Sequence, residues 1–260
     1  MLKAKRLARI IEILRAEGFL TLSDIAGQLG TSVSTVRRDI EHLSRIAPIT
    51  RTHGGAVLNP GETLSFEPGT SLSLEIESDA KRMIGRHGAA LIAPGQAVMF
   101  DSGTTTAEVA RAAAARDIPF TAFTNDITIA AVLSASERIA THVFHGRVRP
   151  GSATLLGADT VADIARIRAD LLFFGTHAGS PEGLSDTSTE LASVKRAFLD
   201  AADIRILVAD RTKFPKRSLC RFAGLDEADR IITDEGIDAD LLAELSRATN
   251  RIEIARKETP

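Results

Sequence analysis

FLTLSDIAGQLGTSVSTVRRDIEHL, residues 19–43, is the stretch that decides the fold of this 260-residue chain. Its apolar spacing predicts two short helices joined by a tight turn. Ser23 is placed to cap the first helix, and Gly30 ends it because glycine tolerates a positive φ. Thr31 or Ser32 caps the second helix. One stripe of a 3.6-residue period in this second helix is apolar, formed by Val33, Val36, Ile40 and Leu43.

The side chains on the opposite face of this second helix are suited to DNA. Short hydroxyls let a helix approach closely, amides at the helix N-terminus favour phosphate, and arginine reaches phosphates or guanine edges. A solvated face of an ordinary amphipathic helix has a similar composition, so the neighbouring segments are needed to distinguish a DNA-binding helix from an ordinary one. The candidate DNA contacts on this face are Ser32, Ser34, Thr35, Arg37 and Arg38.

The segments on either side favour the DNA-binding interpretation. Upstream, Leu7, Ile10, Ile11 and Leu14 form the buried stripe of a helix that ends at Gly18. Downstream, ITRTHGGAVL (49–58) predicts two short strands around a His-Gly-Gly turn. Three helices followed by a hairpin describe a winged helix-turn-helix. The hairpin then supplies Arg51, His53 and Gly54 as contacts to the DNA backbone or minor groove.

Two phrases in this region resemble a known family. TSVSTVRRDIEHL (31–43) and RTHGGAVL (51–58) are similar to the DNA-binding domain of the DeoR family of bacterial repressors. The resemblance implies double-stranded operator DNA as a partner. Because such repressors bind paired half-sites, we also expect a homodimer or homotetramer.

Charge is spread unevenly along the chain. Residues 1–58 carry nine Lys or Arg and five acidic residues, a net charge of +4, whereas the remainder carries 23 and 29, a net charge of −6. A basic head on an acidic body suits a protein in which only the head should attract phosphate. The chain has no Trp or Tyr, which argues against a single-strand binder built on stacked bases.

Composition also restricts the compartment and the cofactors. Cys220 is the only cysteine, so the sequence allows neither an internal disulfide nor a zinc site built from thiolates. We see no apolar run long enough to span a membrane and no export leader. We therefore expect a cytoplasmic protein that makes no membrane contact and requires no metal and no cofactor.

The chain divides into two domains in our prediction. Residues 1–58 form the winged helix-turn-helix, 59–73 a linker that begins Asn-Pro-Gly, and 74–260 an effector-binding and oligomerisation domain. In this second domain strands and helices alternate, which predicts an α/β fold with a mainly parallel sheet. A first helical pattern runs from Leu74 to Pro94. Strands are predicted at 97–100, 120–124, 141–145, 171–175, 204–209, 230–233 and 251–254, and helices at 106–115, 127–136, 158–168, 189–201 and 239–248.

Polar residues that follow the predicted strands form the candidate effector site, because ligands of such sheets bind beyond the carboxyl ends of the strands. DSGTTT (101–106) leads directly into a helix and predicts a phosphate cradle, although an ordinary hydroxyl-rich helix cap is the alternative. No Gly-Lys-Ser/Thr follows, so a nucleoside triphosphatase is not expected. The candidate effector contacts are Asp101, Ser102, Gly103, Thr104, Thr105, Thr106, Thr124, Asn125, Arg147 (or Arg149), His177, Lys195 and Lys213. For the lone His, Arg and Lys residues, a structural or solvated role is the alternative.

The second domain continues the family resemblance. DSGTTT (101–106), TND (124–126), KRAF (195–198) and ADRTKF (209–214) are similar to segments of the DeoR C-terminal domain, and the likeness extends over about residues 3–255. That domain resembles ribose-5-phosphate isomerase and senses phosphorylated sugars or related metabolites. The resemblance therefore implies the same fold and the same class of effector here.

Two departures from the family pattern bear on the effector. Many members have Gly-Ala-Asp-Gly where this chain has GTHAG (175–179), and Gly-Gly where it has Gly146-Arg147. His177 and Arg147 would make the pocket more basic, which predicts an effector with more negative charge or fewer hydroxyls. The missing strand-end carboxylate also argues against isomerase chemistry, although Asp101, Asp126 and Glu190 are nearby. We predict no catalytic residue.

The sequence therefore predicts a DNA-binding regulator, a repressor of a sugar or carbohydrate catabolic operon that is controlled by a phosphorylated sugar or related metabolite. The alternative is an isomerase-like enzyme with an accessory DNA-binding head. A third interpretation is a constitutive architectural protein whose second domain only oligomerises.

Overall fold

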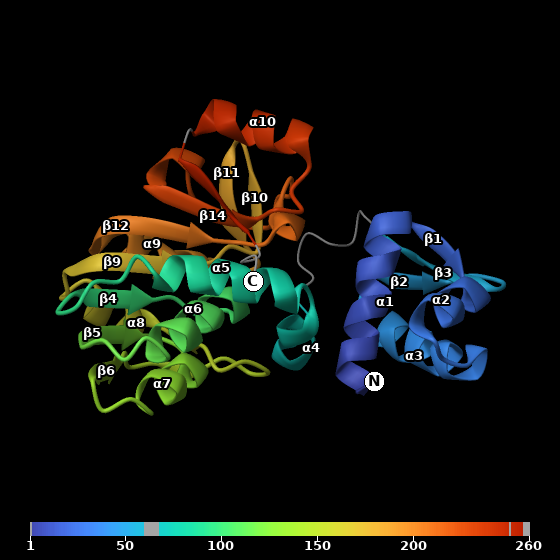
Figure 1. Cartoon of the computed structure of the whole chain (residues 1–260), viewed down its shortest axis with the longest axis horizontal. Helices are drawn as coiled ribbons and strands as arrows, with labels where there is room; N and C mark the ends of the chain where they lie inside the picture. Colours follow the sequence, from blue (N-terminus) through green and yellow to red (C-terminus); the bar gives the residue numbers. More distant parts are fainter. Residues whose placement is uncertain (1, 60–67, 250, 257–260) are drawn as a thin grey trace. The chain divides into compact units, whose positions relative to one another are not determined.

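The computed structural model describes residues 2–59, 68–249 and 251–256. The chain forms two compact units, Met1–Ser78 and Asp79–Pro260, which we call the head and the body (Figure 1). The N-terminal helix-turn-helix domain and the C-terminal parallel-sheet α/β domain confirm the predicted fold class.

The head contains three helices, a small sheet and a short fourth helix. An antiparallel sheet of order β1-β3-β2 packs with the helices around one apolar core. Its elements are α1 (Lys3–Glu17), β1 (Phe19–Thr21), α2 (Leu22–Leu29), α3 (Val33–Ile46), β2 (Ile49–Arg51), β3 (Gly55–Leu58) and α4 (Thr70–Glu75).

The helix ends in the head differ in detail from the predictions. α2 begins at Leu22, so Thr21 rather than Ser23 is its cap, in a reciprocal capping box with Asp24. Gly30 ends α2 in the left-handed conformation, as predicted. Ser32 caps α3, and its hydroxyl accepts from the Thr35 amide at 3.2 Å. Val33, the first residue of the predicted apolar stripe, is 38% exposed, and the buried part of the stripe begins at Val36.

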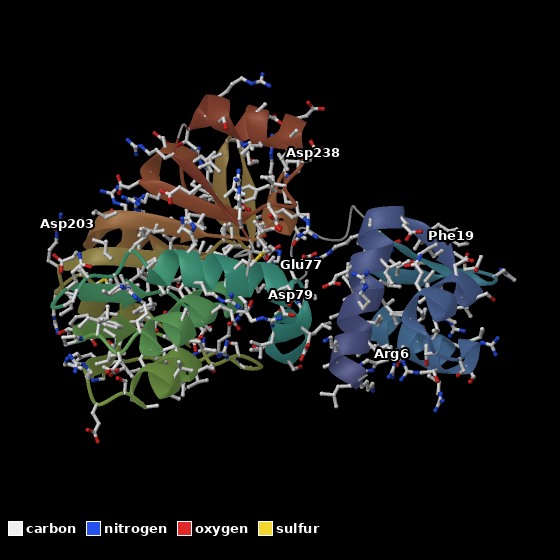
Figure 2. All side chains as sticks on the ribbon, in the orientation of Figure 1. Arg6, Phe19, Glu77, Asp79, Asp203 and Asp238 are labelled. Atoms are coloured by element: carbon white, nitrogen blue, oxygen red, sulfur yellow. The ribbon has the colours of Figure 1, made fainter. Side chains whose placement is uncertain are left out.

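Strand β1 was not predicted, because its three residues pair only with the distant strand β3. A close approach at Gly55 permits this pairing. A Cβ atom there would lie 2.2 Å from the Leu20 carbonyl oxygen and 2.8 Å from the ring of Phe19. Phe19 itself lies at the start of β1 (Figure 2). Gly55 therefore fixes where the strands of the wing meet the rest of the head.

Helix α4 belongs to the head. Leu72 and Ile76 are buried in the head core, and the Glu77 amide donates to the Glu12 carboxylate on α1 at 2.9 Å. The unit boundary after Ser78 thus falls later than the predicted start of the second domain at residue 74. Of the predicted linker 59–73, residues 60–67 lie outside the described residues.

The body is built on a seven-stranded sheet of order β15-β14-β12-β9-β4-β5-β6, in which every neighbouring pair is parallel. Its strands are β4 (Ala97–Phe100), β5 (Phe120–Thr124), β6 (Ile139–Val143), β9 (Ala169–Phe174), β12 (Ala202–Val208), β14 (Arg230–Asp234) and β15 (Ile252–Ala255). The helices are α5 (Ser78–Ala89), α6 (Thr104–Ala114), α7 (Ile127–Leu133), α8 (Ala158–Ile164), α9 (Thr189–Asp200) and α10 (Ala239–Ala248). β6 begins and ends two residues before the strand predicted at 141–145.

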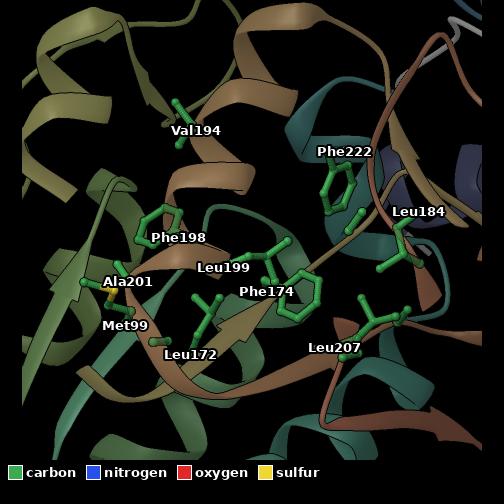
Figure 3. Packing of buried hydrophobic residues seen from close by; sticks show 14 of the residues in the cluster. Met99, Leu172, Phe174, Leu184, Val194, Phe198, Leu199, Ala201, Leu207 and Phe222 are labelled. Atoms are coloured by element: carbon green, nitrogen blue, oxygen red, sulfur yellow. The ribbon is translucent and has the colours of Figure 1, made fainter. Parts of the chain in front are cut away.

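Two apolar clusters cover the two faces of this sheet. Side chains alternate along a strand, so Phe100 joins the cluster with residues of α5, α6 and α7, whereas Met99 joins the other. In that second cluster the ring centroid of Phe174 on β9 lies 6.5 Å from that of Phe222, and Phe198 of α9 belongs to the same cluster (Figure 3). Because helices cover both faces of the sheet, the polar loops lie at the ends of the strands.

Short strands that were not predicted form two smaller sheets beside the seven-stranded one. β7 (Arg147–Val148) and β8 (Leu155–Leu156) form a small hairpin. A separate antiparallel sheet joins β10 (Ala178–Ser180), β11 (Gly183–Asp186) and β13 (Cys220–Ala223). Both smaller sheets supply residues to the candidate effector site.

Candidate functional site

The exposed face of α3 carries the predicted DNA contacts. Val36, Ile40 and Leu43 point into the head core, whereas Arg37 and Arg38 are exposed. The Arg38 Nε donates to the Ser34 carbonyl oxygen at 3.4 Å, which holds the guanidinium beside the first turn. The first turn of α3 therefore presents hydroxyls and cations together.

The aspartate of the Val-Arg-Arg-Asp sequence has a structural role that sequence reasoning missed. Asp39 is buried, and both of its carboxylate oxygens accept from Arg6 of α1, at 2.5 and 3.1 Å. Figure 2 places Arg6 on α1. This pair fixes α3 against α1 and leaves the neighbouring arginines facing outward.

The wing carries the remaining predicted DNA contacts. β2 and β3 pair in register, with Arg51 opposite Ala56. Arg51, His53 and Gly54 are all exposed around this hairpin. Gly54 has a φ of 146°, a conformation that favours glycine. The wing therefore presents a cation and an imidazole on a tight turn.

The body has a topological switch point between β4 and β9. From β4 the chain adds β5 and β6 on one side, and then returns to β9 on the other. A crevice for a ligand forms at such a point, outside the carboxyl ends of the two strands. Asp101 follows β4 and Gly175 follows β9, and the Gly175 amide donates to the Asp101 carboxylate at 3.3 Å.

A buried charged cluster occupies this point. The Lys195 ammonium of α9 donates to Asp101 and to the Gly175 carbonyl oxygen, at 3.0 Å for the latter, and lies 3.6 Å from the Asp186 carboxylate. All three charged residues are buried. Burial raises the pKa of the Asp101 carboxyl, although the Lys195 ammonium opposes this shift. Lys195 is thus held by carboxylates and is not a solvated lysine.

The DSGTTT loop leads into α6 without a side-chain cap. Gly103 is the N-cap residue with a φ of 141°, and within the described residues no side chain caps the first amides of α6. Ser102 and Thr105 are mostly buried, and Thr104 is partly exposed. Thr106 is fully buried and its hydroxyl donates to the Gly103 carbonyl oxygen at 3.2 Å. Backbone amides, together with Ser102 and Thr104, are therefore the groups placed to meet an anion.

The loop after β5 is buried beneath the β7–β8 hairpin. The Asn125 amide group donates to the Leu155 carbonyl oxygen at 3.1 Å, while its Oδ1 is buried with no partner within the described residues. The Thr124 hydroxyl accepts from the Asp126 amide at 3.1 Å. Asp126 caps α7, and burial raises the pKa of its carboxyl although two amides donate to it. Asp126 therefore has a structural role as the N-cap of α7.

The remaining predicted contacts lie around these loops. Arg147 on β7 is exposed and pairs with Glu190 of α9 at 3.2 Å. His177 is partly exposed, between β9 and β10. Lys213 lies two strands from β4, after β12, beside the buried Asp210. Burial would raise the pKa of Asp210, but the Lys213 and Lys81 ammonium groups and donation from Thr212 outweigh it and lower this pKa.

Asp186 is the residue of this site that sequence reasoning missed. It lies on β11, a four-residue strand without a recognisable pattern, and no neighbour in the sequence indicates that it approaches Lys195. Among the described residues, no group of three or more His, Cys, Asp or Glu is arranged to hold a metal ion. Within the same part of the chain, no helix has the length and apolar character needed to cross a membrane.

These two units together define a class of protein, a DNA-binding transcriptional regulator with a separate α/β sensor domain. Residues 6–61 match the family described as "DeoR-like helix-turn-helix domain". Residues 76–235 match the family described as "DeoR C terminal sensor domain". The chain belongs to the DeoR family of transcriptional regulators.

Three relatives match along nearly the whole chain. The HTH-type transcriptional regulator GlpR of Haloferax volcanii is 34% identical, covering 95% of this chain and 96% of the relative. The HTH-type transcriptional repressor GlcR of Bacillus subtilis is 32% identical, covering 90% and 89%. The lactose phosphotransferase system repressor of Lactococcus lactis is 28% identical, covering 96% and 98%.

Solved structures show the fold alone. The translation initiation factor eIF-2B of Pyrococcus horikoshii aligns with a TM-score of 0.50 at 16% identity, covering 88% of this chain and 87% of that chain. Ribose 5-phosphate isomerase A of Methanocaldococcus jannaschii aligns with a TM-score of 0.39 at 14% identity, covering 53% and 54%. At these identities a similar fold does not indicate a similar activity, so function has to be argued from the site.

Proposed function

We propose that this regulator represses a carbohydrate catabolic operon, and that a phosphorylated sugar or related metabolite bound in the body controls its affinity for the operator. Its relatives include proteins named as repressors, one of them a repressor of a lactose phosphotransferase system. The observation that carries the proposal is the convergence of the uncapped α6 N-terminus with the loops after β4 and β9 at the switch point.

On DNA, we propose that a homodimer or homotetramer places two copies of α3 in successive major grooves, about 34 Å or a multiple apart. Arg37 and Arg38 supply phosphate or guanine contacts. Ser34 and Thr35 approach base edges and backbone, while Ser32 fixes the start of the helix as its cap. Arg51, His53 and Gly54 anchor the wing.

In the body, we propose that the phosphate lies against the α6 amides, Gly103, Ser102 and Thr104. The sugar portion extends along the carboxyl ends of the strands. Asn125 has an oxygen with no hydrogen-bond partner in the part of the chain that the structure describes, and Asp101 pairs with Lys195 at the same ends of the strands. His177, Arg147 and Lys213 lie around its rim in this proposal.

Control requires that the effector have different affinities for two arrangements of the protein. A coupling free energy of about 1–3 kcal/mol changes operator affinity by roughly 5- to 150-fold. The sign of the coupling is the experimental question, and we expect the effector to release the operator.

We propose that the body binds its ligand without turnover. The buried carboxylates near the crevice are engaged, since Asp101 pairs with Lys195 and Asp126 caps α7. A general base must reach the proton that it abstracts, and carboxylates held by these partners are not positioned to do so. An assay with aldose and ketose phosphates tests this point, and interconversion of any pair by the purified protein would favour the enzyme alternative.

The main test is fluorescence anisotropy of a labelled duplex from upstream of the gene, titrated at two salt concentrations. A panel of sugar phosphates is then added to the complex. We expect tight, salt-sensitive binding that one class of compound reverses. Ser102→Ala should weaken the response to that compound, whereas Ser193→Ala, on the exposed side of α9, should leave it unchanged. Binding no tighter than to random DNA would contradict the proposal.

The charge of the effector can be tested separately. The Arg147 guanidinium is paired with Glu190. We expect the other departure, the imidazole of His177 in place of a carboxylate, to favour extra negative charge. His177→Asp should then reduce the preference for a diphosphorylated over a monophosphorylated ligand. An unchanged preference would contradict this part of the proposal.

A further inference from the structure

Val33 is an exposed apolar residue on a face that is otherwise polar. It is the first residue of α3, and 38% of its surface is exposed. The buried stripe of the helix begins one turn later, at Val36, which is fully buried. The core therefore does not explain why a valine occupies the first position.

The groups around Val33 form a hydrogen-bonded first turn. The Ser32 hydroxyl lies 3.0 Å from that of Ser34 and 2.9 Å from that of Thr35, and it accepts from the Thr35 amide. Arg38 reaches back to the Ser34 carbonyl oxygen. The turn is therefore well fixed, and its hydroxyls already have partners within the protein.

A valine on such a turn presents its two methyl groups in a defined direction. β-branched residues in a helix keep mainly one χ1 rotamer. Little side-chain entropy is lost when these methyl groups are buried against a partner, and burial of apolar surface is favourable. Val33 therefore suits an apolar contact of fixed position.

The major groove offers one apolar group at the edge of a base. The first residues of a recognition helix contact base edges, and among the four bases only thymine carries a methyl group there. We propose that Val33 selects a thymine in each operator half-site by packing on its C5 methyl group. This inference rests on the proposed operator binding and adds a residue that determines its sequence preference.

The test uses deoxyuridine, which differs from thymidine only by lacking that methyl group. The full-length protein first selects a duplex from a random-sequence pool. Each thymine of the selected duplex is then replaced in turn, and affinity is measured by fluorescence anisotropy. We expect one position per half-site at which the replacement weakens binding about fourfold, the effect of roughly one buried methyl group at about 0.8 kcal/mol.

The matched variant is Val33→Ala, which favours the helix and removes the two methyl groups. We expect it to bind the thymine duplex about as weakly as the wild type binds the uracil duplex, and to be insensitive to the replacement. Its affinity for random DNA and its far-UV circular dichroism should equal those of the wild type. Val33→Ile, which retains a branched apolar side chain, should keep the sensitivity.

Three outcomes would overturn the proposal. A selected duplex that shows no sensitive thymine would refute the contact while leaving operator recognition intact. A Val33→Ala protein that remains sensitive at the same position, or that loses affinity for random DNA to the same extent, would assign the effect to another residue or to the fold. A wild-type protein that selects no sequence would contradict operator recognition itself, and this inference with it.

Discussion

Replacing Arg6 with methionine would remove one half of the bidentate pair that joins α1 to the recognition helix. Methionine keeps an unbranched apolar stem but carries no charge. The Asp39 side chain is only 5% exposed, so its carboxylate would stay buried without the guanidinium. Breaking a buried pair in this way costs about 3–5 kcal/mol. Because 18% of the Arg6 side chain is exposed and water can reach the vacated space, we expect about 3 kcal/mol.

Urea denaturation measures this loss. For a unit of this size the slope is about 1 kcal/mol per M, so the midpoint of the head should fall by about 3 M. The chain has no Trp or Tyr, so far-UV circular dichroism follows the helices. Anisotropy of a labelled duplex in the same urea series adds a readout of the head, because the head supplies the recognition helix and the wing. Unfolding of the body would affect wild type and variant equally, so their difference reports the head.

Two further variants make the result interpretable. Arg45→Met breaks the exposed Arg45–Glu41 pair on the same helix α3, and should cost less than about 0.5 kcal/mol. Adding Asp39→Leu to Arg6→Met should recover most of the lost stability, because an apolar replacement of a whole buried pair is often neutral or stabilising. If Arg6→Met unfolds at the wild-type urea concentration, the buried carboxylate does not depend on Arg6 and the reasoning is refuted.

Arg38→Ala should weaken operator binding more than tenfold without changing oligomer size, as measured by anisotropy and light scattering; retained affinity would mean that α3 does not read the operator. Gly55→Ala should cost the head about 1–3 kcal/mol because the added Cβ meets backbone, whereas Gly27→Ala, with open space around it on α2, should be neutral or stabilising in urea. Equal midpoints for these two variants would contradict the close approach. The lowered pKa of Asp210 contributes stability above its ordinary value of 3.8, and this contribution is lost as pH falls through the folded value. The deficit of Asp210→Asn in urea should therefore shrink below about pH 4, while the exposed Asp203→Asn control stays near the wild type throughout; a deficit independent of pH would count against the pairing.

The regular elements of the body followed from local patterns. β4, β5 and α10 have the predicted bounds, because an apolar run followed by polar loop residues is a signal carried within each segment. Helix α3 was predicted for the same reason, since its stripe and its cap are neighbours in the sequence. Val33 was placed in the apolar stripe although it is 38% exposed. A helical period predicts the direction in which a side chain points, but it does not show where the core ends.

The elements that were not predicted depend on distant partners. β11 and β13 pair although they are separated by more than thirty residues, and neither is long enough to show alternation. Asp186 of β11 lies 3.6 Å from the Lys195 ammonium of α9, so its place in the candidate effector site is a property of the tertiary structure. Asp39 was overlooked for a similar reason, because its partner Arg6 lies on another helix.

The packing of α4 determines how this regulator can be divided and recombined. Leu72 and Ile76 fill the head core, and burying two such side chains contributes about 3–6 kcal/mol, comparable to the whole stability of a small domain. A chimaera joined at residue 58 would separate the DNA-reading unit from part of its own interior. Exchange of heads between relatives is therefore expected to succeed when the junction follows residue 78, where the interior of the head is complete.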